Sequence, residues 1–203
     1  MTVARRVFGF LRRMLIGDDI VLVRQTKEQW ERQFAAGAWD RLQEGQPNTI
    51  ELARCILTYA RAKKGHIRVL DVGCGNGGLA RLLSKKSGIA YTGIDISEVA
   101  LATAHMSAPE GYFVTGDAEE PPPDIGAFDI LVFSEVLYYM NPDRVLPRYR
   151  IHATADARVF VSVVRFWRTP FVFHRIRRYL HIDKRFRVAD SSHRWDIAIG
   201  HFI

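Results

Sequence analysis

Residues 69–78 read VLDVGCGNGG, so an acidic residue and a run of glycines directly follow a short apolar segment. Glycine has no Cβ, and a ligand can therefore approach the backbone of such a turn closely. Residues 79–86 have a helical pattern, and the first N–H groups of a helix have no partner within it. A strand, a glycine turn and a helix in this order predict a nucleotide-type site at the carboxyl end of the strand.

Asp71 indicates which nucleotide-type ligand suits this turn. Gly73, Gly75 and Gly78 also fit the dinucleotide pattern G-x-G-x-x-G. A carboxylate two residues before the first glycine would repel a pyrophosphate, whereas a ligand with an ammonium and a sulfonium would tolerate it. The motif therefore favours S-adenosylmethionine over NAD, and a nicotinamide oxidoreductase remains an alternative.

Further acids follow other apolar segments. Residues 89–95 are predicted to form a strand that ends at Asp95, where a carboxylate can accept both hydroxyls of a ribose. A third strand around residues 112–118 has Asp117 just past its end. Residues 128–133 are almost continuously apolar, as expected in the middle of a parallel sheet. Acids that recur at one edge of a sheet form a polar rim for a single ligand.

The order and spacing of these motifs resemble the class I S-adenosylmethionine-dependent methyltransferases. The resemblance rests on D-x-G-x-G-x-G at 71–77, on the strand end at Asp95, on Gly116-Asp117-Ala118 and on Phe128-Asp129. It covers residues 67–140 by motif and the remainder by strand order. It implies an α/β, Rossmann-like sheet of seven mostly parallel strands, the last antiparallel, with helices on both faces. We expect residues 1–46 to cap a methyltransferase core formed by residues 47–203.

The resemblance also implies contacts with the cofactor S-adenosylmethionine. Asp71 would reach the methionine ammonium directly or through water, Asp95 the ribose hydroxyls, and Asp117 the adenine amino group. Cys74 is expected in the motif for its small size, and Asp129 is expected to be structural. The predicted cofactor-binding residues are Asp71, Gly73, Cys74, Gly75, Asp95, Ile96, Asp117, Ala118, Ser134 and Trp30.

Residues 134–140, SEVLYYM, should leave the sheet beside the transferable methyl group and carry the chemistry. We predict Glu135, Tyr138 and Tyr139 as catalytic residues, because a positioned base contributes about 10²–10⁴-fold in rate. The N-P-P-Y motif of many nucleic-acid and protein amino-methyltransferases is absent here. The segment instead resembles the nodulation-factor N-methyltransferases, which methylate an amino sugar. His152 and His174 are expected to be structural, and no motif indicates a metal.

Two regions precede the core. Residues 29–34 and 39–42 resemble the aromatic-rich helix that caps the cofactor in many small-molecule methyltransferases, which brings Trp30 or Trp39 to the site or into the core. Residues 1–16 alternate arginines with apolar residues at helical spacing. That helix would pack on the domain, contact a membrane surface or act as a transit peptide.

Composition narrows the possible partners. Two cysteines supply neither a disulfide framework nor a zinc cluster, so we expect a cytoplasmic protein, with attachment to a membrane surface left open. Residues 144–203 contain 13 lysines and arginines against four aspartates, a net charge of +9. A region with this positive charge suits an anionic partner, although arginines on a solvated helix face explain the charge equally well. No RNA-binding motif accompanies the arginines, which argues against nucleic acid.

The predicted partner is therefore a small-molecule or glycan acceptor, an anionic one included. The predicted activity is transfer of a methyl group to an amine or hydroxyl of that acceptor. The alternative is a non-catalytic S-adenosylmethionine-binding module that docks an anionic partner or a membrane surface.

Overall fold

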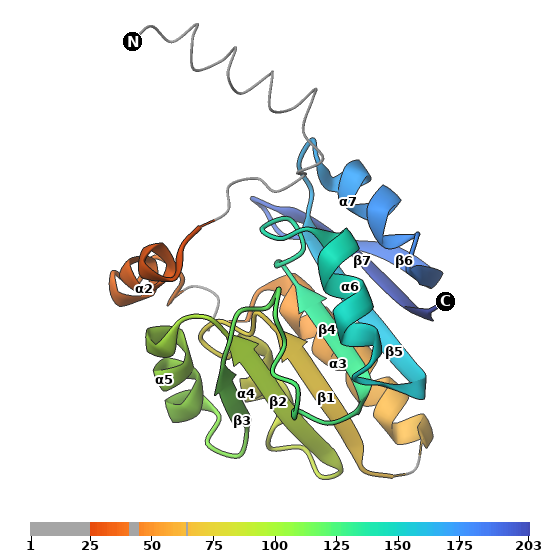
Figure 1. The fold of residues 1–203 in the computed structure, drawn as a ribbon, viewed down its shortest axis with the longest axis horizontal. Coiled ribbons are helices and arrows are strands. Elements are labelled where there is room, and N and C mark those ends of the chain that lie inside the picture. Colours follow the sequence, from red (N-terminus) through yellow and green to blue (C-terminus); the bar gives the residue numbers. More distant parts are fainter. Residues whose placement is uncertain (1–24, 41–44, 64) are drawn as a thin grey trace, which may run out of the picture.

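The computed structural model describes residues 25–40, 45–63 and 65–203, which form one seven-stranded sheet flanked by helices (Figure 1). The strands lie in the order β3-β2-β1-β4-β5-β7-β6. Five of them pair in parallel, and β7 runs antiparallel to both of its neighbours. The predicted fold is confirmed. In chain order the strands are Ile67–Val72, Ile89–Asp95, Tyr112–Thr115, Phe128–Ser134, Ala153–Val164, Leu180–Ala189 and Arg194–Phe202.

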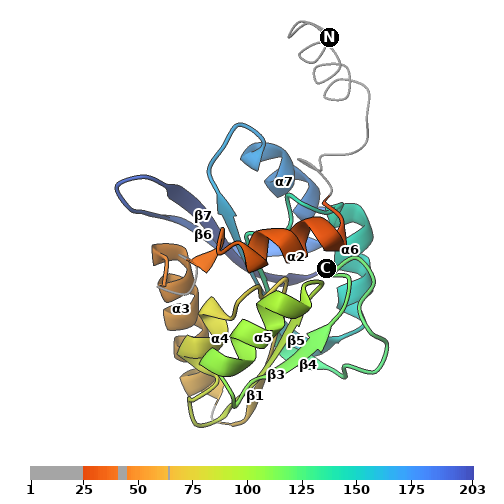
Figure 2. The same ribbon diagram turned by 90° about the vertical axis from the view of Figure 1, so that its left-hand side faces the viewer.

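The sheet has two apolar faces, because successive side chains along a strand point to opposite sides and both sets of side chains are apolar here. Leu70 and Phe133 belong to a cluster that includes buried residues of α6 (Pro142–Arg150) and α7 (Thr169–Ile176). Their neighbours Val69 and Val132 belong to a second cluster with α3 (Pro47–Lys63) and α4 (Gly78–Leu83). The sheet is therefore covered on both faces, as a parallel sheet requires (Figure 2).

Two further helices lie close to the carboxyl ends of the strands. The helix α5 (Glu98–Ser107) follows β2 and is capped by Ser97, whose hydroxyl accepts from the N–H of Ala100. The helix α2 (Lys27–Ala35) begins with a capping box between Thr26 and Gln29. Figures 1 and 2 show α2 lying beside α5, outside the two-sided core.

Element boundaries in the last third differ from those predicted. The sequence alone predicts a fifth strand over residues 158–164, whereas β5 begins at Ala153, because its pairing with β4 shifts register between Phe128 and Ile130 and then continues. The sequence likewise predicts a helix over residues 169–180, but α7 ends at Ile176, since Leu180 already pairs with Phe202 in the terminal hairpin. Such register shifts have no sequence signature.

The predicted helix over residues 1–16 lies outside the described residues. Within the described part of the chain, no helix has the length and apolar character needed to cross a membrane. The proposed division at residue 46 stays a prediction; the described helix α3 begins at Pro47.

Candidate active site

A cavity of about 290 Å³ lies at the carboxyl ends of β1, β2 and β4. The strand order reverses between β1 and β4, and the crevice at such a point is where open α/β sheets bind ligands. Its wall combines residues from the strand ends, from α2 and from the terminal hairpin. The predicted site residues that line it are Trp30, Gly73, Gly75, Asp95, Ile96, Asp117, Ala118, Ser134, Glu135, Tyr138 and Tyr139.

The glycine turn forms the floor of the cavity. Gly73 and Gly75 have φ of 71° and 53°, a left-handed conformation that side chains disfavour. A Cβ at Gly73 would lie 2.6 Å from Val136 Cγ2. A Cβ at Gly75 would lie 3.6 Å from the ring of Phe34, in the space between the turn and α2. Both glycines therefore keep the backbone accessible from the cavity.

Asp95 links this turn to the end of β2. Its Oδ2 accepts a hydrogen bond from Gly75 N at 2.8 Å, and its Oδ1 accepts from Ser97 N at 3.0 Å. Burial raises the pKa of Asp95, and the backbone hydrogen bonds oppose this rise. The two oxygens together have four acceptor positions, more than the three backbone donors at Gly75, Ile96 and Ser97, so the carboxylate can still accept from a ligand hydroxyl.

Asp117 and Ala118 follow β3 at the far side of the cavity. One oxygen of Asp117 accepts from Glu119 N at 2.8 Å, which closes the turn after the strand. Asp117 is exposed and Ala118 is buried. The pair thus offers one carboxylate edge and one backbone segment to the same cavity.

An aromatic wall closes the cavity on the side of α2. The ring of Trp30 packs edge-on against Tyr139, with ring centroids 5.0 Å apart. Phe34 and Trp39 pack on Trp30 at 6.3 and 5.9 Å. Trp39 is also held by its carbonyl, which accepts from the Asn76 amide at 2.9 Å. Aromatic side chains in this geometry supply large apolar contact at fixed positions.

Glu31 fixes α2 over the cavity. Its carboxylate accepts from the Ser97 hydroxyl at 2.7 Å and from the N–H groups of Glu98 and Val99 at 2.8 and 3.1 Å. These are the free donors at the N-terminus of α5. Partial burial raises the pKa of Glu31, but the three hydrogen bonds outweigh it, and the pKa lies below its usual value. No local pattern predicts this contact between Glu31 and Ser97, which lie 66 residues apart in the chain.

Glu135 and Tyr138 form a hydrogen-bonded pair at the cavity wall. The Tyr138 hydroxyl donates to Glu135 Oε2 at 3.1 Å, and Val164 N donates to the same oxygen at 3.0 Å. The Ser162 hydroxyl donates to Oε1 at 2.8 Å and accepts from the Asn48 amide at 3.1 Å. Removal from bulk water raises the pKa of Glu135 to about 7, against the lowering effect of these donors.

Asp71 and Cys74 are not among the residues that line the cavity. Asp71 is buried below the turn, where its Oδ2 accepts from the Tyr91 hydroxyl at 2.6 Å. Its Oδ1 is buried without a hydrogen-bond partner in the described chain. Burial raises the pKa of Asp71 to about 7. The Cys74 thiol occupies the space beside Gly93, where a Cβ on that glycine would lie 2.7 Å from Cys74 Sγ.

Several lining residues were not predicted from the sequence, among them Phe34, Gln46, Val164, His193 and Trp195. The last two come from the terminal hairpin, whose place beside β5 depends on long-range pairing. His152 lies elsewhere, with Nδ1 3.0 Å from the Gly126 carbonyl, and His174 does not line the cavity. Asp129 accepts from Arg68 N at the amino ends of the strands.

Residues 69–152 match a family model described as a methyltransferase domain. An uncharacterised methyltransferase, sll0829 from Synechocystis sp., is 39% identical over 75 residues, which cover 37% of this chain and 35% of that protein. A ubiquinone biosynthesis O-methyltransferase from Pseudomonas aeruginosa is 31% identical over 136 residues, 62% of this chain and 57% of that protein. The chain thus spans between about a third and somewhat over half of these curated relatives.

One solved structure has the same fold as this chain over most of its length. The N-methyltransferase NodS from Bradyrhizobium japonicum, solved with S-adenosyl-l-homocysteine, superposes with a TM-score of 0.68 over 90% of this chain and 98% of that chain. At 16% identity this likeness shows the fold alone. The chain therefore shares the fold of that methyltransferase, and its residues 69–152 match a methyltransferase domain.

Proposed function

We propose that the protein transfers a methyl group from S-adenosylmethionine to an amine or hydroxyl of a small molecule or glycan. One observation carries the proposal. A single cavity is lined both by the glycine turn with Asp95 and Asp117, and by the Glu135–Tyr138 pair. Groups suited to a nucleoside and groups suited to proton transfer therefore face the same space.

The cavity residues fit the cofactor. The room above Gly75, which a Cβ would fill, suits close approach of the ligand to the backbone. The remaining acceptor capacity of Asp95 suits a ribose hydroxyl, and Asp117 with Ala118 suits the edge of an adenine. Ile96 and Trp30 supply apolar contact, and the backbone at Ser134 lies within the same wall.

Asp71 would act from beneath the turn. It does not line the cavity, so we propose that it reaches the methionine ammonium through water, with the unpartnered Oδ1 as the acceptor. A cation above the turn would lower the pKa of this buried carboxyl and stabilise its ionised form. Cys74 contributes by its small volume beside Gly93.

S-adenosylmethionine supplies an activated methyl group on a sulfonium, so the protein has mainly to orient the acceptor and manage its proton. Orientation of this kind contributes about 7–11 kcal/mol to the lowering of a barrier. The Tyr138 hydroxyl donates to Glu135, which leaves the phenol oxygen able to accept a hydrogen from the acceptor. As the acceptor loses its proton, Tyr138 would take it and pass its own to Glu135. Tyr139 would hold the acceptor against Trp30.

A methyl-transfer assay tests the proposal. The protein is incubated with S-adenosylmethionine and a panel of amino sugars, phenols and small amines, and S-adenosylhomocysteine and methylated product are measured by mass spectrometry. We expect turnover of at least one acceptor. Glu135→Gln and Tyr138→Phe should each lower kcat by about 10²–10⁴-fold, because each interrupts the proton path.

Asp124→Asn is the matched control, because this exposed carboxylate lies outside the cavity and its loss should leave kcat unchanged. Full turnover by both Glu135→Gln and Tyr138→Phe would contradict their catalytic role. Cofactor binding without turnover of any acceptor class in the panel would favour the non-catalytic module instead.

A further inference from the structure

A second recess adjoins the cavity on the side of the terminal hairpin. It has a volume of about 410 Å³ and shares Val164 and His193 with the main cavity. Its wall is completed by the segment after β5 and by the turn before β7, with Arg165, Phe166, Ser192 and Arg194. A ligand in this recess would therefore lie next to the main cavity on the side of Glu135, whose carboxylate accepts from Val164 N.

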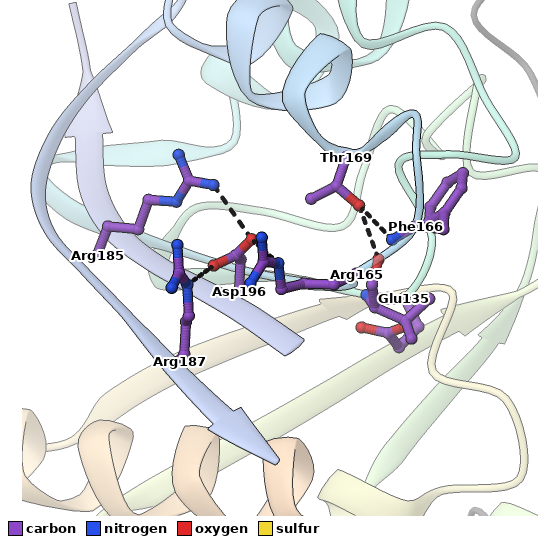
Figure 3. A network of polar contacts seen from close by, with 8 residues as sticks. Glu135, Arg165, Phe166, Thr169, Arg185, Arg187 and Asp196 are labelled. Carbon is purple, nitrogen blue, oxygen red and sulfur yellow. Dashed lines mark hydrogen bonds and ion pairs between the residues drawn. The ribbon is translucent and has the colours of Figure 1, made fainter. Parts of the chain in front are cut away.

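The recess is bordered by a cluster of arginines around one buried carboxylate. Asp196 is only 2% exposed and contacts three guanidinium groups. Its oxygens lie 3.4 Å from Arg165 Nε, 3.2 Å from Arg185 Nη2 and 3.2 Å from Arg187 Nε. Figure 3 shows Asp196 between these side chains and Glu135 on the other side of Arg165. One carboxylate cannot neutralise three arginines.

The neighbouring charges leave the recess positive. Arg194 adds a fourth guanidinium to the wall. Asp190 is the other acid of the turn; it accepts from the N–H groups of Ser192 and His193 and lies 3.8 Å from the His193 ring. The carboxylates near the recess are Asp196, Asp190 and Glu135. Even when all three are counted as ionised, the four arginines leave a net positive charge.

Arg165 is held in place and keeps N–H donors of its guanidinium that Asp196 does not bind. The Thr169 hydroxyl accepts from Phe166 N at 3.0 Å and donates to the Val164 carbonyl at 2.9 Å, which fixes the turn that carries Arg165 (Figure 3). Arg165 contacts Asp196 through Nε, so its two Nη groups, with four N–H donors, remain for a ligand. A guanidinium with free Nη donors binds carboxylate or phosphate oxygens in a paired geometry.

We propose that this recess binds an oxyanion group, carboxylate or phosphate, of the methyl acceptor. Arg165 and Arg194 are the ligand-binding residues, and Asp196 orients Arg165. An acceptor anchored there extends its amine or hydroxyl across Val164 and His193 towards Tyr138 and Glu135. The role as an acceptor subsite rests on the proposed methyl transfer, whereas the binding of an oxyanion does not depend on it.

Titration calorimetry at low ionic strength tests the subsite with inorganic phosphate and with succinate, and with dimethyl succinate as the neutral counterpart. The full chain is used with and without S-adenosylhomocysteine. We expect both anions to bind with Kd on the order of millimolar and the diester not to bind. Arg165→Gln and Arg194→Gln should each weaken anion binding about 10-fold, as expected for loss of a charge-assisted hydrogen bond.

Arg150→Gln is the control for the loss of one positive charge. Arg150 is exposed at the end of α6 and does not line the recess, so its loss should change anion affinity by less than about threefold. Arg194 is exposed, so Arg194→Gln keeps the test intact if Arg165→Gln fails to fold.

Absence of saturable phosphate and succinate binding, or an equal loss of affinity in Arg150→Gln, overturns the subsite. S-adenosylhomocysteine binding in the same samples separates the two claims. If the cofactor product binds and the anions do not, the subsite fails while the proposed function stands. If the anions bind and the cofactor product does not, the proposed function fails while oxyanion binding stands.

Discussion

Glu135 combines a strained backbone with a carboxylate removed from bulk water. Its φ of 58° is the one positive value of a non-glycine residue in the described chain. Such a conformation costs about 1–3 kcal/mol and persists where surrounding contacts determine it. Three donors from Tyr138, Ser162 and Val164 supply those contacts. Strain of this kind is typical of functional sites, which agrees with the proposed proton path.

The raised pKa of Glu135 makes stability depend on pH. Its native pKa is about 7 against an ordinary value of 4.5, so the native state holds its proton more tightly than the unfolded state. Stability from this group is full below pH 4.5 and is lost as the pH rises through 7, by about 3 kcal/mol. Glu135→Gln removes this titration.

Denaturant unfolding of both proteins at pH 4.5, 6 and 8 measures this difference. The free energy of unfolding of wild type, minus that of Glu135→Gln, should fall steadily over this range. Glu110→Gln is the control, because this exposed carboxylate lies outside the cavity. A pH-independent difference between wild type and Glu135→Gln would contradict the assigned pKa.

At the scale of elements, α2 is held mainly by polar contacts. None of its residues is buried, so packing alone does not fix it over the cavity. Its anchors are the Glu31 carboxylate on the N-terminus of α5 and an ion pair between Lys27 and Glu98 at 2.5 Å. The Lys27 pair is partly exposed and contributes little. Glu31 therefore controls the position of Trp30 and the aromatic wall.

Glu31→Ala should weaken binding of S-adenosylhomocysteine about 10-fold, because it removes charge-assisted hydrogen bonds that hold the cap. The melting temperature should change little, since α2 buries no residue of the core. Calorimetric titration and thermal unfolding measure the two effects. Glu28→Ala, on the same helix but exposed, is the control. Unchanged affinity in Glu31→Ala would show that α2 is positioned by other contacts.

At the scale of the whole molecule, the features that the sequence predicts are those that depend on residues close together in the chain. The glycine turn, the acids at strand ends and the apolar strands have local signatures, and they predicted the sheet and its binding edge. Contacts between distant segments have none. Glu31 on α5, Ser162 on Glu135 and the hairpin residues His193 and Trp195 at the cavity all require the folded topology.

The fold shows where the excess positive charge of residues 144–203 lies. The basic half contains β6, β7 and the segment after β5, which together place Arg165, Arg185, Arg187 and Arg194 beside the cavity. The sequence left open whether that charge was a solvated face or a binding surface. The pairing of β6 with β7 brings Arg185 and Arg187 to Asp196, and the sequence alone does not predict that pairing.

Calorimetric titration with S-adenosylhomocysteine tests the central claim most directly, with NADH as the control ligand. We predict micromolar binding of S-adenosylhomocysteine alone, weakened about 10- to 100-fold in Asp95→Ala by the loss of charged hydrogen bonds to the ribose. Far-UV circular dichroism establishes that the variant is folded. Binding of NADH, or equal S-adenosylhomocysteine affinity in wild type and folded Asp95→Ala, would contradict the assignment of this cavity.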